Sequence, residues 1–288
     1  MSAATQGTPA DRDDDPPEPV SKGERLGIVS YTNVAPLHWG LEPWDGAVFE
    51  HGVPTELNAR LLAGEIDLTL VSSIEFVRHR DVLRALPDFS IATVGPVQSV
   101  MLFHRGAWRD LGGASIAVTT DSATSVALLE LLLREDGIDA RFVPHPPDLD
   151  EMLRHHDAAL LIGDAALEEA VASRAVGDDV PHQTDLGEAW YRLTRLPFTF
   201  AVWAAHVDRP PSPRLVAELR AARNRGLGHL AAVAVEEAAA RRLSPEVILR
   251  YLANFRYFLE PPDRHGLEAF AQRLDPTFAP DQLGYWNV

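Results

Sequence analysis

The chain of 288 residues is long enough for one or two domains, and its 46% hydrophobic and 24% charged residues are ordinary for a globular protein. Its net charge of −16 argues against nucleic acid and against an anionic membrane surface as partners. The absence of cysteine excludes disulfides, a thiolate nucleophile and a cysteine-ligated iron–sulfur cluster, and the single lysine, Lys22, leaves none in the folded part for Schiff-base or pyridoxal phosphate chemistry.

The N-terminal stretch 1–23 is rich in Asp, Pro and small residues. It has neither a basic start nor an apolar stretch, so it does not have the pattern of a secretory signal. Its composition predicts a disordered leader, with order beginning near Arg25. No apolar run in the chain reaches the roughly 18 residues of a membrane span, so no membrane partner is expected.

Hydrophobic periodicity then predicts short strands that alternate with helices. Strands are expected at 25–30, 66–72, 114–120, 157–164 and 196–206, and the stretch 89–104 is expected to form two strands or one strand broken at Gly95-Pro96. Helices are expected at 54–65, 73–80, 121–136, 165–174, 212–242, 244–259 and 264–274. The alternation indicates an α/β fold with largely parallel sheets and a helical C-terminal segment.

Small polar residues follow four of the expected strands, at the edge where sheets of this class bind ligands. The four sites are Ser30-Tyr31-Thr32-Asn33, Ser72-Ser73, the run from Thr119 to Ser125, and Gly163-Asp164. N-capping explains one Ser, Thr, Asn or Asp at each helix start, but the first three sites hold more polar residues than a cap needs. The joint pattern favours a cleft lined by hydroxyls and by free helix N–H groups.

Such a cleft suits a small anion, because helix N-termini present unpaired N–H donors and a partial positive charge. A small carboxylate fits better than a nucleotide, since the chain has neither a GxGxxG nor a GxxxxGK[ST] pattern. No cofactor is expected. The adjacent His155 and His156 would face different directions on a helix and have no ligand-spaced partner, so no metal is expected either.

Six blocks carry a family resemblance: SYTNVAPL, GVPTELNARLLAGEIDLTLVSSIEF, PDFSIATVGPVQSVMLF, TTDSATSVALLELLL, LLIGDAAL and LGEAWYRLTRLPFTFAVWA. In this order, from about residue 25 to 206, they resemble the chorismate dehydratases of the futalosine route to menaquinone. The resemblance implies a two-lobed fold like that of type II periplasmic binding proteins, with the ligand cleft between the lobes. It implies a cytoplasmic enzyme with chorismate as its partner, and it leaves a homodimer open.

The expected lobes are 24–103 plus 203–288 for lobe one and 104–202 for lobe two, with hinge strands SVMLF and FAVWA. The implied reaction removes water from chorismate and leaves 3-[(1-carboxyvinyl)oxy]benzoate, so the enzyme is a carbon–oxygen lyase. Removal of a ring proton and the neighbouring hydroxide aromatises the ring. The enzyme must therefore position a base and stabilise the negative charge on the ring carboxylate.

The resemblance gives catalytic roles to Asn33 and Ser99. The amide of Asn33 is neutral and cannot be a base, so the implied mechanism is substrate-assisted. The enolpyruvyl carboxylate takes the ring proton, while Asn33 and Ser99 orient that carboxylate and the departing hydroxyl. Thr32 and Val34 stand where leucine and threonine are more common in the family, which affects the pocket shape. Substrate binding is expected from Ser30, Tyr31, Ser72, Ser73, Ser122, Ala123, Thr124, Ser125, Gly163 and Asp164.

Several alternatives stay open. Asp164 and Asp121 each fit a helix cap or a general base. Trp190 fits a place over the cleft or in the core, and the apolar stripe 247–259 fits the core or a dimer contact. A cytoplasmic solute-binding or effector-sensing protein would have the same cleft without the chemistry. The 1,4-dihydroxy-6-naphthoate synthases share the fold but use a lobe-two histidine as base, and no histidine stands at the strand end of Gly163.

Overall fold

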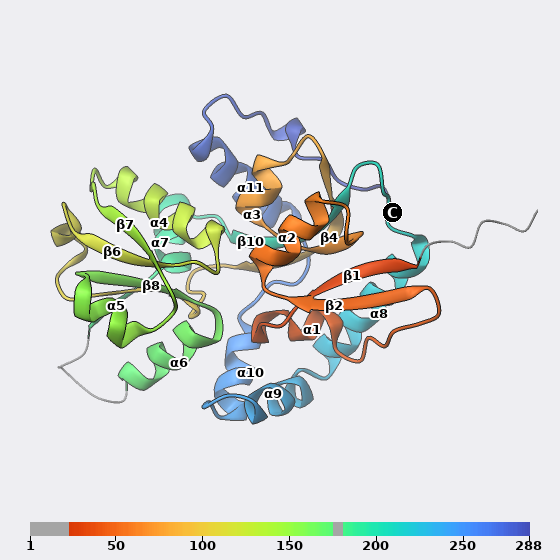
Figure 1. Ribbon diagram of the computed structural model, residues 1–288, viewed down its shortest axis with the longest axis horizontal. Coiled ribbons are helices and arrows are strands. Elements are labelled where there is room, and N and C mark those ends of the chain that lie inside the picture. The colour runs from red at the N-terminus through yellow and green to blue at the C-terminus, as the bar shows by residue number, and fades with distance from the viewer. Residues whose placement is uncertain (1–22, 175–180) are drawn as a thin grey trace, which may run out of the picture.

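The computed structural model describes residues 23–174 and 181–288, which form two five-stranded sheets with helices on their faces. Figure 1 shows the two sheets side by side, each with its own helices, so the molecule has two lobes. The predicted leader lies outside the described residues, apart from Gly23, and the first strand begins at Glu24.

The first sheet has the strand order β2-β1-β3-β10-β4. Its central strand β3 pairs in parallel with β1, which pairs in parallel with the edge strand β2, whereas β10 runs antiparallel to β3 and β4. The bounds are β1 (Glu24–Val29), β2 (Ala47–Gly52), β3 (Leu68–Ser72), β4 (Leu83–Thr93) and β10 (Phe198–His206). The helices of this lobe are η1 (Thr32–Val34), α1 (Ala35–His38), α2 (Pro54–Leu62), α3 (Ser73–Arg78), α8 (Pro213–Gly228), α9 (Leu230–Ala239), α10 (Pro245–Ala253), α11 (Pro261–Leu274) and η3 (Pro280–Gln282).

The second sheet repeats this design with the order β7-β6-β8-β5-β9. Strand β6 pairs in parallel with β7 and β8, and β5 runs antiparallel to β8 and β9. The bounds are β5 (Val100–His104), β6 (Ser115–Thr119), β7 (Arg141–His145), β8 (Ala158–Ile162) and β9 (His182–Asp185). The helices are η2 (Trp108–Leu111), α4 (Ala123–Glu135), α5 (Leu149–His155), α6 (Gly163–Arg174) and α7 (Leu186–Thr194).

The period-two alternation of β5 and β8 explains how this sheet buries both faces. Val100 and Leu102 of β5 belong to the large cluster that extends through both lobes, whereas Met101 and Phe103 belong to a smaller cluster under α5 and α6. A strand buried on both sides reads as a continuous apolar run. Such runs are the signal by which the sequence predicted these two strands.

The lobe boundaries differ from the expected ones. The stretch SVMLF lies mostly in β5, which pairs only within the second sheet, and FAVWA lies in β10, which pairs only within the first. The chain therefore changes lobe at 94–99, between β4 and β5, and at 195–197, between α7 and β10. The reason is that a strand whose ladder hydrogen bonds are all made within one sheet belongs to that lobe. The chain therefore crosses between the lobes outside its strands.

The expectation of largely parallel sheets is wrong at β5 and β10, whose return direction makes both sheets mixed. Sequence periodicity also missed β2, β7 and β9, together with the short helices α5 and α7. The three missed strands lie at sheet edges, and only one of their residues, Ala47, is buried. Edge strands bury little, so they lack the apolar run that predicted the central strands.

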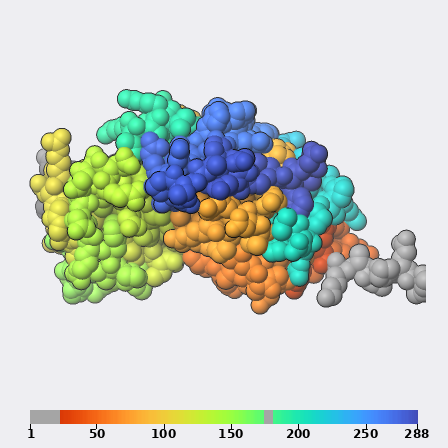
Figure 2. All heavy atoms as spheres, turned by 90° about the horizontal axis from the view of Figure 1, so that it is seen from above, coloured from red at the N-terminus to blue at the C-terminus, as the bar shows by residue number. Residues whose placement is uncertain are grey.

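The C-terminal helices and tail complete the first lobe (Figure 2). The backbone of Arg256 forms an isolated β-bridge with Ala92 of β4, and that of Tyr285 forms an isolated β-bridge with Ala85. The apolar stripe 247–259 lies mainly in the core, where Ile248, Tyr251 and Leu252 are buried. Phe258 of the same stripe is exposed.

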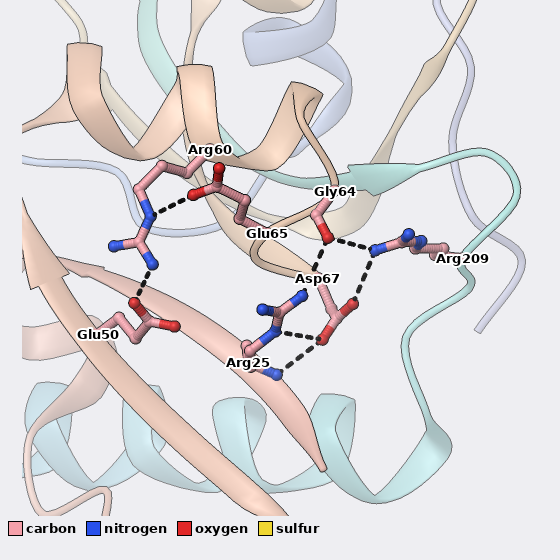
Figure 3. Close-up of polar contacts among 7 residues, drawn as sticks. All are labelled: Arg25, Glu50, Arg60, Gly64, Glu65, Asp67 and Arg209. Carbon is pink, nitrogen blue, oxygen red and sulfur yellow. Dashed lines mark hydrogen bonds and ion pairs between the residues drawn. The ribbon is translucent and has the colours of Figure 1, made fainter. Parts of the chain in front are cut away.

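Two groups of ion pairs lie around the loop before β3: one joins this loop to β1 and to the segment after β10, and the other joins it to β2 and α2 (Figure 3). Arg25 and Arg209 both donate to the carbonyl of Gly64 and lie beside the carboxylate of Asp67. Arg60 bridges Glu50 and Glu65. None of these residues lines the cavity of about 250 Å³ that lies between the lobes, so we assign these ion pairs to structure only.

Candidate functional site

A cavity of about 250 Å³ lies between the lobes, at the carboxyl ends of β1, β3, β6 and β8. This is the position at which α/β sheets bind ligands. Its polar lining comes from both lobes, and its apolar lining includes Leu70, Ile91 and Phe200. Of the residues predicted from the sequence, the cavity brings together Tyr31, Asn33, Ser72, Ser99, Ser122, Ala123, Ser125 and Gly163.

Asn33 lies in the middle of η1 and does not cap a helix. The N-cap of η1 is Tyr31 and that of α1 is Val34, and neither makes a side-chain cap bond. The Oδ1 atom of Asn33 is buried without a hydrogen-bond partner among the described residues. A buried polar atom without a partner costs about 1–3 kcal/mol. The position of Asn33 therefore fits a ligand contact better than a cap.

Ser99 is held at the first crossover between the lobes. Its carbonyl accepts a hydrogen bond of 2.8 Å from the N–H of Gly163. The two preceding residues, Val97 and Gln98, donate their N–H groups to the carboxylate of Asp185 at 3.0 and 2.7 Å. Gln98 has φ of 67°, in the left-handed region that non-glycine residues rarely adopt. The strained turn places Ser99 at the cavity, where its side chain is buried.

Sequence reasoning missed Tyr251 and Asn58, two residues that contact the predicted serines. Tyr251 of α10 donates from its hydroxyl to Ser99 Oγ at 2.8 Å, although the two residues are 152 positions apart. Asn58 of α2 lines the cavity and donates from Nδ2 to Ser72 Oγ at 3.4 Å. Neither residue stands at a strand end. Both are placed by helix packing, for which the linear sequence holds no signal.

The start of α4 supplies two serines to the cavity. Ser122 caps the helix by accepting from the N–H of Ser125 at 3.2 Å, and its hydroxyl donates to Ser125 Oγ at 3.0 Å. The hydrogen of the Ser125 hydroxyl is then free for a ligand. Thr124, between them, does not line the cavity. Its Oγ1 accepts from the N–H of Ile74 at 3.0 Å and so links α4 to α3 of the other lobe.

Tyr31 and Gly163 face each other across the two lobes. A Cβ atom at Gly163 would lie in ordinary van der Waals contact with the ring of Tyr31, at 3.4 Å, so the preference for glycine comes from its φ of 63°. Burial, with the nearby charges of Asp121 and Asp164, raises the pKa of Tyr31 to about 12. Its phenol therefore stays protonated and can donate a hydrogen bond.

Asp164 has a structural use that argues against a general base. Its Oδ2 pairs with Arg241 at 2.8 Å, and its Oδ1 accepts from the N–H of Thr32 at 3.3 Å. It does not line the cavity. The carboxylate thus joins α6 of one lobe to η1 and to the segment after α9 of the other.

The predictions for Ser30 and Ser73 need correction, and of the two alternatives for Trp190 the core placement holds. Ser30 is exposed and does not line the cavity, because the chain turns at the end of β1 and presents Tyr31 instead. Ser73 is buried and donates to the carbonyl of Thr199. Trp190 lies in the core, where it donates to the carbonyl of Pro197 at 3.0 Å and packs against Phe270.

No arginine, lysine or histidine is among the residues that line the cavity within 23–174 and 181–288. Two carboxylates do line it, those of Asp121 and Glu75, and Glu75 pairs with Arg78 at 3.0 Å. An anionic ligand would therefore be held by hydroxyls, amides and the N-terminal ends of α4 and α6. In the part of the chain that the structure describes, there is no cluster of three side chains suited to a metal ion. No helix there has the length and apolarity needed to cross a membrane.

Comparison with known proteins gives a consistent result. A family model described as menaquinone biosynthesis matches residues 24–276. The chain is 48% identical over 267 residues to a chorismate dehydratase of Thermus thermophilus, covering 88% of this chain and 96% of that protein.

Among solved structures, a protein of Archaeoglobus fulgidus matches with a TM-score of 0.70 at 18% identity, covering 89% of this chain and 98% of that one. The periplasmic aliphatic sulphonate binding protein of Escherichia coli matches with a TM-score of 0.63 at 16% identity, covering 92% of each chain. These likenesses establish a fold like that of periplasmic binding proteins.

Proposed function

The chain belongs to the menaquinone biosynthesis family, and we propose from this premise that it is a chorismate dehydratase. It removes water from chorismate and forms 3-[(1-carboxyvinyl)oxy]benzoate, as a carbon–oxygen lyase of the futalosine route. The observation that carries the proposal is the 48% identity to a chorismate dehydratase over nearly the whole chain. The interlobe cavity supports it, because Asn33 and Ser99 both line that cavity.

The cavity suits a small dicarboxylate that is bound without cationic side chains. Hydroxyl donors come from Tyr31, Ser99 and Ser125, and the amide of Asn33 adds a donor. The first turns of α4 and α6 contribute partial positive charge, which is worth roughly 0.3–1 kcal/mol each and up to about 2 kcal/mol when partly buried. These local contributions oppose the repulsion expected from a chain of net charge −16.

The reaction takes a proton from the ring carbon that bears the enolpyruvyl ether, and hydroxide leaves from the neighbouring carbon. Proton and hydroxide together form the water released, and the ring becomes aromatic. Asn33 is neutral, Tyr31 is protonated, and Asp164 is occupied by Arg241. Two other carboxylates, those of Asp121 and Glu75, line the cavity. Following the mechanism that the family resemblance implies, we propose that the enolpyruvyl carboxylate of the substrate is the base, with Asn33 and Ser99 orienting this carboxylate and the departing hydroxyl.

Two other readings are less well supported. A 1,4-dihydroxy-6-naphthoate synthase would need a histidine base, and no histidine lines the cavity within the described ranges. A solute-binding protein would share the fold, but the sulphonate binding protein of Escherichia coli is only 16% identical to this chain. The high identity is to an enzyme.

Incubation of the purified protein with chorismate tests the proposal directly. The expected result is loss of chorismate with formation of an aromatic product about 18 mass units lighter, because each chorismate loses one water. Binding of chorismate without turnover would favour the solute-binding reading instead. The cytoplasmic location and a homodimer stay predictions, to be tested by cell fractionation and by sedimentation.

A further inference from the structure

Ser99 is contacted from behind by a side chain that lies outside the cavity. Tyr251 is 1% exposed and does not line the cavity, yet its hydroxyl lies 2.8 Å from Ser99 Oγ. Its ring packs edge-on against Phe255 with centroids 5.0 Å apart, which limits the movement of the phenol. The contact therefore joins the helical C-terminal segment to the crossover between the lobes.

The direction of this hydrogen bond follows from burial. A buried phenol must donate its hydrogen to some acceptor, and Ser99 Oγ is the acceptor that the described residues offer to Tyr251. Burial also raises the pKa of Tyr251, so the phenol keeps its hydrogen. Ser99 Oγ thus accepts from Tyr251, and it donates to no protein group among the described residues. Its own hydrogen remains for the cavity that it lines.

The backbone of Ser99 has separate support. The N–H of Gly163 donates to the Ser99 carbonyl at 2.8 Å, and Asp185 holds the N–H groups of Val97 and Gln98. Removal of the Tyr251 hydroxyl would leave these bonds in place. The contribution of Tyr251 is therefore to the orientation of one hydroxyl group and not to the position of the crossover.

We propose that Tyr251 is a positioning residue that acts through Ser99, holding the serine hydroxyl so that its hydrogen points at an oxygen of the substrate. The inference rests on the proposed function, since it requires that Ser99 meets the substrate. A hydroxyl that accepts one hydrogen bond also becomes a stronger donor, because successive hydrogen bonds polarise one another. Tyr251 would thus both aim and strengthen the donor at the site of reaction.

A double-mutant cycle tests this with Tyr251→Phe, Ser99→Ala and the combined variant, each assayed for kcat and KM with chorismate. Tyr251→Phe should lower kcat/KM about 3–10-fold, the fold-change expected for loss of one neutral hydrogen bond. In the Ser99→Ala background the same substitution should have no further effect, because the group through which it acts is absent. A purely structural role would not depend on Ser99 in this way.

Tyr257→Phe is a matched control. Tyr257 is also buried and lies six positions along the chain, and it donates to the carbonyl of Leu252 at 3.3 Å without contacting Ser99. It should cost similar stability while leaving kcat and KM as in the wild type. The inference would be overturned if the fold-losses in kcat/KM of Tyr251→Phe and Ser99→Ala multiplied in the double variant. Equal kinetics for Tyr251→Phe and Tyr257→Phe would also overturn it.

Affinity for the benzoate product, measured by calorimetry on the same proteins, separates this inference from the proposed function. Wild-type protein that binds but does not turn over chorismate would overturn the proposed function alone, and the same dependence on Ser99 should then be visible in the affinities. Additive losses of affinity would refute the role of Tyr251. Absence of any binding would overturn both.

Discussion

The substitution Asn33→Asp separates a ligand contact from a structural role at the end of β1. The side chain of Asn33 makes no hydrogen bond with the described residues. The fold therefore loses no hydrogen bond when the amide becomes a carboxylate. The shape of the side chain is also kept. The change in the site is large, however, because it removes an amide donor and adds a negative charge to a cavity that already contains Asp121.

The expected loss of activity has two parts. Removal of one preorganised donor costs on the order of 10²–10³ in kcat, or about 2.7–4 kcal/mol. Repulsion between the new carboxylate and a substrate carboxylate adds to this, by up to about 4 kcal/mol for two charges 4 Å apart at an effective dielectric constant near 20. We therefore expect kcat/KM to fall by about 10² or more, with the donor loss as the lower bound.

The assay follows aromatic product at pH 5.5 to 8, together with urea unfolding of each protein. Burial and the charge of Asp121 should raise the pKa of the new carboxyl. The difference in turnover between wild type and Asn33→Asp should therefore become smaller toward low pH, as this group becomes neutral. Asn287→Asp is the control, because Asn287 is an exposed amide in the C-terminal tail and does not line the cavity. Near-normal turnover of Asn33→Asp at neutral pH would show that Asn33 does not meet the substrate.

Three further predictions concern the base, the interlobe contact and pH. Asp121→Asn should keep or raise turnover if the substrate supplies its own base, whereas a loss above 100-fold, on the order of that for a missing general base, would assign the role to Asp121. Thr124→Val should lower the free energy of unfolding by about 1–3 kcal/mol, because it leaves the buried N–H of Ile74 unpaired; an unchanged urea midpoint would contradict this. Burial, and secondarily the charge of His51, lowers the pKa of His38 from 6.5 to about 4. The unfolded chain then binds more protons than the native one, so stability should fall by up to about 3 kcal/mol as pH drops from about 6.5 to 4. The free energies of unfolding of wild type and of His38→Gln, measured in urea, should therefore change differently over this pH range. Parallel pH profiles for the two proteins would refute the role of His38.

Much of the cavity could be predicted from the sequence, because its polar residues stand where strands end. Tyr31 and Asn33 follow β1, Ser72 ends β3, and Gly163 follows β8. Each position is local, since an apolar run predicts the strand and the next polar residues lie at its carboxyl end. The parallel core of each sheet then brings these ends to one edge.

The tertiary structure alone decided which of these groups are available to a ligand. Ser73 and Thr124 have the same local pattern as Ser72 and Ser125, yet each is used within the protein, by the carbonyl of Thr199 and by the N–H of Ile74 respectively. Whether a hydroxyl is free depends on the backbone groups that another element presents to it. Local sequence does not contain that information, because buried polar groups are paired by the packing of distant segments.

The same reason explains Tyr251 and the direction of β5 and β10. A tyrosine in an apolar helical stripe predicts core packing, and Tyr251 is indeed buried, but its hydroxyl contact with Ser99 depends on how α10 packs against the crossover. Strand periodicity is likewise identical for parallel and antiparallel neighbours, so it could not predict the mixed sheets. Periodicity reports which face of an element is apolar, whereas partners and directions are set by the long-range pairing that closes each lobe.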